Sequence, residues 1–298
     1  MIEILEQLPT LYLWLYILLG VAFLARGVLG SVGSSVRPAT IQCANIAVAI
    51  LFTASLSVHL FHFFTRWIIN GHAPLQSKHE VFTCTGLSMM LFGLVLFLIL
   101  RMWRARGAVS LLGYGVFVLI TGGGGILWTA LGMIEDYKIN NLVPALQSGW
   151  HPPHVSAYML GYGSLGIAAL LGVVYVLGSA GMWVFGANSW WRHLASKEVD
   201  RWTYRIAGLG FPFMTAALCM GAIWADASWG EYWFWDAKET WALRWWACLL
   251  SGVRLRYVKG WAGLKAQLLV VGGGFMIWIT YLWIHVLPAS QASLHVYN

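Results

Sequence analysis

The sequence predicts an all-α membrane protein that crosses the bilayer several times. Of its 298 residues, 59% are hydrophobic and only 10% are charged, whereas about a quarter of the residues in soluble domains are charged. The apolar residues also fall into long runs, and about 20 helical residues are enough to cross the hydrocarbon core. A water-soluble fold would lack polar surface, so we expect about eight transmembrane helices.

Each of the expected spans is an apolar run in the sequence. The runs cover residues 10–28, 41–64, 83–101, 109–133, 156–186, 207–225, 239–257 and 266–286. The first run follows Glu3 and Glu6, and this acidic start differs from the basic start of a cleavable signal peptide. The connections are too short for a separate soluble domain, so we expect a single transmembrane domain over residues 1–298.

The basic residues indicate how the chain is oriented in the membrane. One set of alternate connections holds most of the Lys and Arg residues, and the other holds most of the acids. Because basic loops stay in the cytoplasm, both termini are expected on the periplasmic or lumenal side. The same distribution explains the formal net charge of +7, so the chain shows no clustered basic patch for nucleic acid.

The connection between the sixth and seventh runs is rich in tryptophan. Residues 224–246 contain seven of the 19 tryptophans. Within them, Asp236 and Glu239 have the D-x-x-E spacing of a capping box, which predicts a helix that begins there and continues into the seventh run. An aromatic belt at the membrane surface is the simpler interpretation, but a belt would spread over many connections. We therefore interpret this segment as an apolar surface on the outer side.

Helical spacing adds detail to that surface. Trp241 and Trp245 are four residues apart on the predicted helix and share one face, and Trp229 and Trp233 would share a face of any helical stretch before it. The surface suits a flat apolar ligand with polar edges. Haem has this character, and its flat ring would pack on the indole faces. Its propionates could meet Lys238 or Arg244.

Haem iron also takes imidazole as an axial ligand. The outer connections and the C-terminal tail hold five candidate histidines: His72, His79, His151, His154 and His295. Any one of them alone is weak support, because an interfacial histidine more often contacts water or a carbonyl group. Two histidines from different outer connections could approach a haem from its two sides.

At this point the motifs resemble a known family. The segment W-G-x-Y-W-x-W-D-x-K-E-T-W-A-L, from Trp229 to Leu243, resembles the WWD signature of haem-handling membrane proteins. Its K-E-T-W-A-L ending is similar to the CcsA (ResC) family, whereas the related CcmC and CcmF proteins vary there. The segments Leu142–Ser156 and Leu294–Tyr297 also resemble that family, so the likeness covers most of the chain.

The resemblance implies a b-type haem, bound non-covalently at the outer face between His154 and His295. The WWD loop over residues 224–246 would hold the ring. The residues implied there are Trp229, Trp233, Trp235, Asp236, Lys238, Trp241 and Arg244.

The function implied is cytochrome c maturation. With a CcsB (ResB) partner, the chain would present haem to the two thiols of a C-x-x-C-H motif in apocytochrome c, as a subunit of a cytochrome c haem lyase. It would lie among the lipids of a bacterial inner membrane or a thylakoid membrane, as a multi-pass protein.

The sequence departs from the family at Arg254, where members generally carry a histidine associated with haem movement across the membrane. A guanidinium group has no acceptor and cannot ligate iron. His59 and His62, three residues apart in the second run, are secondary candidates for a haem route, although each is as readily explained by a bond to a neighbouring helix. The alternative function is therefore a scaffold or haem-bearing subunit of a respiratory or electron-transfer complex that has lost haem export.

Overall fold

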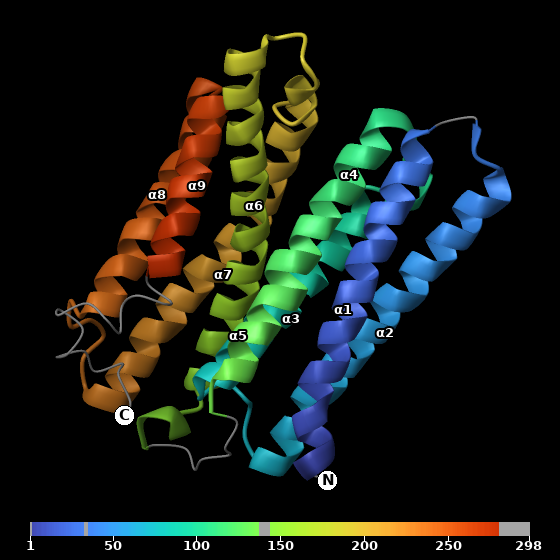
Figure 1. Cartoon of the computed structure of the whole chain (residues 1–298). Coiled ribbons are helices and arrows are strands. Elements are labelled where there is room, and N and C mark those ends of the chain that lie inside the picture. The colour runs from blue at the N-terminus through green and yellow to red at the C-terminus, as the bar shows by residue number, and fades with distance from the viewer. Residues whose placement is uncertain (1, 33–34, 137–143, 280–298) are drawn as a thin grey trace. The chain divides into compact units, whose positions relative to one another are not determined.

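The structure is a computed structural model, and it describes residues 2–32, 35–136 and 144–279. The regular secondary structure in these residues is helical and includes no strand, so the predicted all-α class is confirmed. By its internal contacts the chain divides into two compact units, Met1–Leu142 (unit 1) and Val143–Asn298 (unit 2), and Figure 1 shows the helices of each. The single domain expected over the whole chain stays a prediction.

The helices follow one another through short connections. Unit 1 contains α1 (Ile2–Ser31), α2 (Pro38–Asn70), α3 (Lys78–Ile99), the short helix η2 (Met102–Arg104), α4 (Gly107–Ile120), the π-helical segment η3 (Thr121–Leu127) and α5 (Trp128–Ile134). Unit 2 contains η4 (Pro144–Gln147), α6 (His151–Phe185), η5 (Trp190–His193), α7 (Lys197–Trp229), α8 (Ala237–Lys259) and α9 (Leu264–Trp278).

Six helical stretches of the described residues are long and apolar enough to cross a membrane. They are Leu5–Ser31, Pro38–Asn70, Lys78–Ile99, Ser110–Ile134, His151–Phe185 and Trp190–Trp229. Each contains or overlaps one of the first six predicted runs, which confirms a multi-pass membrane protein. The seventh predicted run, 239–257, lies within α8, and the eighth, 266–286, begins in α9 and continues past the described residues. The count of eight spans therefore stays a prediction.

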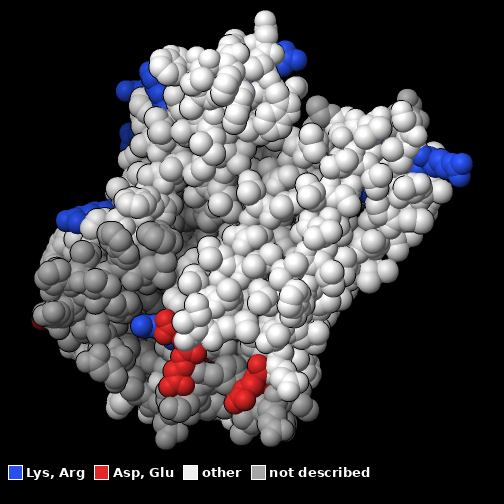
Figure 2. All heavy atoms as spheres, viewed as in Figure 1, with Lys and Arg blue, Asp and Glu red and all other residues white. Residues whose placement is uncertain are grey.

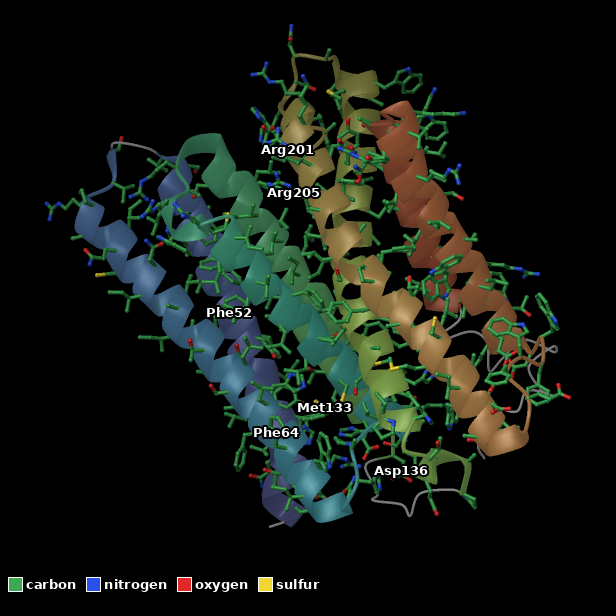
Figure 3. All side chains as sticks on the ribbon, turned by 180° about the vertical axis from the view of Figure 1, so that it is seen from behind. Phe52, Phe64, Met133, Asp136, Arg201 and Arg205 are labelled. Carbon is green, nitrogen blue, oxygen red and sulfur yellow. The ribbon has the colours of Figure 1, made fainter. Side chains whose placement is uncertain are left out.

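In unit 1, α1 contacts α2, α4, η3 and α5. Phe23 of α1 lies among Phe52, Phe97 and Phe117, with ring centroids 5.4 to 6.1 Å apart, and Phe52 is labelled in Figure 3. These aromatic residues form an apolar core within unit 1. They separate a polar group around Arg26 at one end from the histidines of α2 at the other.

The two ends of unit 1 differ in charge. The α1–α2 and α3–α4 connections carry Arg37, Arg101 and Arg106, whereas the opposite end carries Glu135 and Asp136. Figure 2 shows Lys and Arg atoms at the first of these ends of unit 1 and Asp and Glu atoms toward the other. This is the asymmetry on which the predicted orientation depends, and the side of the termini stays a prediction.

Unit 2 pairs α6 closely with α7, and α9 packs against α6 and α8. Near the beginning of α7, Asp200 accepts hydrogen bonds from Arg256 at 2.7 Å and from Gln267 at 2.8 Å. Figure 3 labels Arg201 and Arg205 at the same end of α7. This polar network joins α7, α8 and α9 at one end of unit 2. The opposite end, where α7 ends and α8 begins, carries the tryptophan-rich loop.

Candidate functional site

The tryptophan-rich loop begins where α7 ends. Gly230 follows Trp229 in the left-handed conformation, with φ of 85°, and residues 230–236 are not helical. Helical spacing therefore does not place Trp229 and Trp233 on a common face. The Trp229 ring instead lies 6.3 Å from that of Phe234, so the loop folds back toward the end of α7.

The first turn of α8 contains the capping box that the D-x-x-E spacing predicted. The Asp236 carboxylate accepts from the backbone N–H of Lys238 at 2.6 Å and of Glu239 at 3.2 Å. The Glu239 carboxylate accepts from Asp236 N at 3.3 Å and also from Phe234 N at 2.9 Å. Glu239 is buried, and these two bonds connect the end of the loop to the first turn of α8. The predicted helix start is confirmed.

Trp235 has an uncommon backbone conformation. Its φ is 58°, and Arg101 is the other non-glycine residue with a positive φ in the described part of the chain. For a bulky residue this left-handed conformation is a genuine outlier. The side chain is nevertheless 70% exposed, and its ring stands edge to face with that of Trp233 at 5.9 Å. The loop thus presents the Trp235 indole outward.

His154, in the first turn of α6, lies beside the last turns of α7. Its ring stacks on Trp224 with centroids 5.5 Å apart and planes 30° apart. Trp224 in turn lies 4.9 Å from Trp229, and its indole N–H donates to the carbonyl oxygen of Ala145 at 2.9 Å. The structure therefore brings the predicted ligand His154 together with Trp229 of the WWD loop, through Trp224.

A backbone hydrogen bond determines the tautomer of His154. Its Nδ1 lies 2.8 Å from the carbonyl oxygen of Ala217, and since a carbonyl can only accept, Nδ1 must carry the proton. In a neutral imidazole the lone pair is then on Nε2, and metal-binding histidines are commonly oriented in this way. Gly221 permits this approach of α6 to α7, because a Cβ at that position would stand 2.8 Å from His154 Nδ1.

The aromatic contacts of His154 extend along α6 and α8. Tyr158 lies edge-on to His154 at 4.9 Å, and the fully buried Trp245 of α8 lies 6.3 Å from Tyr158. We refer to Trp224, Trp229, His154, Tyr158 and Trp245 as the His154 cluster. Its members come from three helices, so the position of the imidazole depends on how α6, α7 and α8 pack.

Two basic side chains lie in the first turns of α8. Burial lowers the pKa of Lys238 to about 8, and the Asp236 carboxylate opposes that shift. Arg244 is exposed, and its guanidinium lies 5.1 Å from the centroid of the Trp241 ring, a favourable cation–π distance. Both positive groups suit carboxylate edges of a ligand. The rings of Trp233 and Trp235 contact each other.

His59 and His62 face the interior of unit 1. Their Nδ1 atoms lie 2.9 Å from the Tyr16 hydroxyl and 3.5 Å from the Tyr12 hydroxyl, and the Tyr12 ring stacks on His59 at 4.0 Å. The cavity beside them has a volume of about 10 Å³, roughly the space of one water molecule. A haem route through this pair would need a different side-chain arrangement, and its secondary role stays a prediction.

The other candidate histidines make local contacts. His72 Nδ1 lies 3.0 Å from the carbonyl oxygen of Ala73, and the buried His79 donates from Nδ1 to a carbonyl group of α5 at 2.8 Å. His151 is buried, and its ring centroid lies 5.5 Å from that of Trp224. His295 lies outside the described residues, so its predicted role as the second ligand stays a prediction.

The sequence interpretation did not single out Trp224, Tyr158 or Gly221. His154 and Tyr158 are four residues apart and share a face of α6, but α6 begins at His151, before the predicted start of the run at residue 156, so the sequence interpretation did not place them on one helix. The contact between Trp224 and His154 joins two helices, and periodicity within one helix carries no information about its neighbour. The role of Gly221 follows from that same contact.

Comparison with known proteins identifies the family. The chain matches the Cytochrome C assembly protein family over residues 3–290. It is 32% identical to the cytochrome c biogenesis protein CcsA of Trieres chinensis over 262 residues, which cover 78% of this chain and 80% of that protein. This chain belongs to the CcsA-type cytochrome c assembly proteins.

Two further relatives agree with this assignment. The CcsA of Cyanophora paradoxa is 31% identical, with 80% of this chain and 83% of that protein covered. The CcsA of Chlamydomonas reinhardtii is 29% identical, with 92% and 75% covered. The resemblance drawn from the WWD motif is thus confirmed, and the role of the chain is in cytochrome c biogenesis.

Proposed function

We propose that this CcsA-type chain binds haem at the outer face of the membrane and presents it for attachment to apocytochrome c. The observation that carries the proposal is the arrangement of His154. Its Nδ1–H is bound by Ala217 and its ring is stacked on Trp224, so the Nε2 lone pair belongs to a fixed imidazole beside several indoles. An oriented imidazole and aromatic surfaces are what haem needs from a protein.

The residues present fit haem in their chemistry. His154 and His295 would ligate the haem iron. Lys238 and Arg244 would pair with the propionates, since both are cationic near neutral pH. Charge pairing at two points would fix the rotation of the ring, while Trp229, Trp233, Trp235 and Trp241 would cover its faces, and Asp236 would hold the loop by its capping bonds.

When bound, haem would supply two vinyl groups, and a cysteine S–H bond would add across each of them to form a thioether. The attachment needs free thiols, reduced iron and a correct approach, so the contribution of this chain is binding and orientation. We propose that it acts with a CcsB-type partner as part of a cytochrome c haem lyase. Its place would be a bacterial inner membrane or a thylakoid membrane, with both termini on the periplasmic or lumenal side.

One observation favours a second function. Arg254 is an exposed residue of α8, and it supplies no imidazole at the position where the family generally has one. A chain that no longer exports haem across the membrane could serve as a scaffold or haem-bearing subunit of a respiratory or electron-transfer complex. This function predicts that cytochrome c maturation continues when the gene is deleted.

Complementation separates the two functions. A strain without the chain is supplied with the wild type, His154→Ala or His193→Ala, and covalently bound haem is measured on secreted cytochrome c. His193 lies in η5, at the end of α6 opposite to His154, which makes it a matched control. Haem lyase function predicts that His154→Ala loses the holocytochrome while His193→Ala keeps it. Normal maturation in the His154→Ala strain contradicts the proposal.

A further inference from the structure

The conformation of Trp235 is not explained by the residue type or by packing of its side chain. A left-handed φ of 58° is unfavourable for an L residue, and glycine or asparagine would adopt it more easily. Burial does not account for the residue either, because the side chain is 70% exposed. A strained conformation with an exposed aromatic ring is a combination found at functional sites. We therefore expect the Trp235 indole to contact a molecule other than this chain.

The first turn of α8 imposes this conformation. One oxygen of Glu239, Oε2, accepts from Phe234 N at 2.9 Å and from Asp236 N at 3.3 Å, the two N–H groups on either side of Trp235. The Thr240 hydroxyl donates to the carbonyl oxygen of Trp235 at 3.2 Å. An ordinary capping box needs only the bond from Asp236 N, so the bond from Phe234 N is additional.

N–H groups that converge from both sides of a left-handed residue form a concave site for an anion. Here the anion is the carboxylate of the protein's own Glu239, which is buried. Without it, the two N–H groups would have no common acceptor and φ of Trp235 could return to a negative value. That rotation would change the direction of the indole and disrupt its edge-to-face contact with Trp233.

We infer that Glu239 is a positioning residue that holds the Trp235 indole outward as a contact surface for haem, and that Thr240 assists it. The inference rests on the proposed haem binding and adds to it a residue whose role is exerted through the backbone. Glu239 does not touch haem. Its carboxylate determines the direction of a ring that does.

Two measurements on the full-length protein in detergent test this role. The first is hydrogen–deuterium exchange of the peptide over residues 231–240, and the second is titration with hemin. In Glu239→Ala, exchange at Phe234 and Asp236 should rise about tenfold, and hemin should bind about tenfold more weakly. Glu239→Gln should restore both readouts, because its amide oxygen accepts the same two bonds.

Two further variants distinguish a specific effect of Glu239 from a general loss of folding. Glu231→Ala removes an exposed carboxylate from the same loop and should leave both readouts unchanged. Trp235→Gly accepts a positive φ without strain, so it should keep the slow exchange while weakening hemin binding as Glu239→Ala does.

The outcomes separate this inference from the proposed function. If the wild type binds hemin and both Glu239→Ala and Trp235→Gly bind it equally well, the positioning role is overturned and the proposed function stands. If exchange in Glu239→Ala matches the wild type, the carboxylate does not hold the loop and the inference also fails. If the wild type binds no hemin, the proposed function itself fails and takes this inference with it.

Discussion

Gly221 offers a direct test of the way His154 is held. In Gly221→Ala, the added Cβ would lie closest to His154 Cε1 and 2.8 Å from Nδ1, whereas unbonded heavy atoms need about 3.5 Å. Relieving the contact with Nδ1 alone requires the ring to move by roughly 0.7 Å, and the contact with Cε1 requires a larger movement. The Nδ1 to Ala217 hydrogen bond, now 2.8 Å long, would then reach the limit of hydrogen-bond geometry.

The expected cost follows from three terms. Overpacking costs about 1–3 kcal/mol, the lost hydrogen bond costs about 1 kcal/mol, and replacing glycine by alanine in a helix returns about 1 kcal/mol. The net destabilisation of Gly221→Ala is therefore about 1–3 kcal/mol. Gly208→Ala is the control on the same helix, because a Cβ at Gly208 meets nothing within 4 Å. It should gain about 1 kcal/mol.

Denaturant titration in mild detergent measures the stability of both variants, and hemin titration measures binding. We expect Gly221→Ala to bind hemin about tenfold more weakly than Gly208→Ala, which corresponds to about 1.4 kcal/mol. If the two variants have the same stability and the same hemin affinity, His154 is not packed against Gly221 and the reasoning is refuted.

Three other predictions follow from the contacts described. Trp224→Phe should cost about 1 kcal/mol of unfolding free energy, because the hydrogen bond to Ala145 is lost while the ring packing remains. Arg66→Met should destabilise unit 1 by about 3–5 kcal/mol, since it leaves Glu80 of a buried ion pair without its cation, and adding Glu80→Gln should recover most of this loss. The affinity for hemin should fall as the pH rises through about 8, where Lys238 loses its proton. The affinity of Lys238→Arg should stay constant across that range, because the guanidinium stays charged.

Each of these predictions has its own control. Trp183→Phe alters an 88% exposed indole and should leave stability unchanged, so an equal loss there contradicts the Trp224 contact. If Arg66→Met and the double variant with Glu80→Gln are equally stable, Arg66→Met does not leave an unpaired charge on Glu80 and the prediction is contradicted. A fall in hemin affinity near pH 8 that Lys238→Arg shares must come from another titrating group.

The local features of the site could be predicted from the sequence. The Asp236 capping box depends on residues within one helical turn, and the six confirmed spans depend on runs of apolar residues. Both signals are contained in neighbouring positions, so no knowledge of tertiary packing was needed. The membership of the chain in the CcsA group followed from a local motif in the same way.

The contacts between helices could not be predicted. The stacking of His154 on Trp224 requires α6 and α7 to approach at Gly221, and helical periodicity leaves the pairing of faces undetermined. The left-handed Trp235 was missed for a related reason. The D-x-x-E pattern predicts the bond from Asp236, but the second bond of Glu239, from Phe234, depends on the path of the loop.

The secondary histidines show the same limit. His59 and His62 stand out in the sequence as ionisable residues of a span, and the sequence does not show that Tyr16 and Tyr12 meet their Nδ1 atoms. The partner hydroxyls come from a different helix, so the pairing is a property of the packed unit. His295 remains a prediction of the sequence.

The most direct test of haem binding through His154 is the absorption spectrum of the detergent-purified protein, oxidised and reduced, with its haem quantified. We predict a low-spin, imidazole-ligated spectrum that weakens strongly in His154→Ala and persists in His193→Ala. Haem content and spectrum that are the same in His154→Ala as in the wild type would contradict the account.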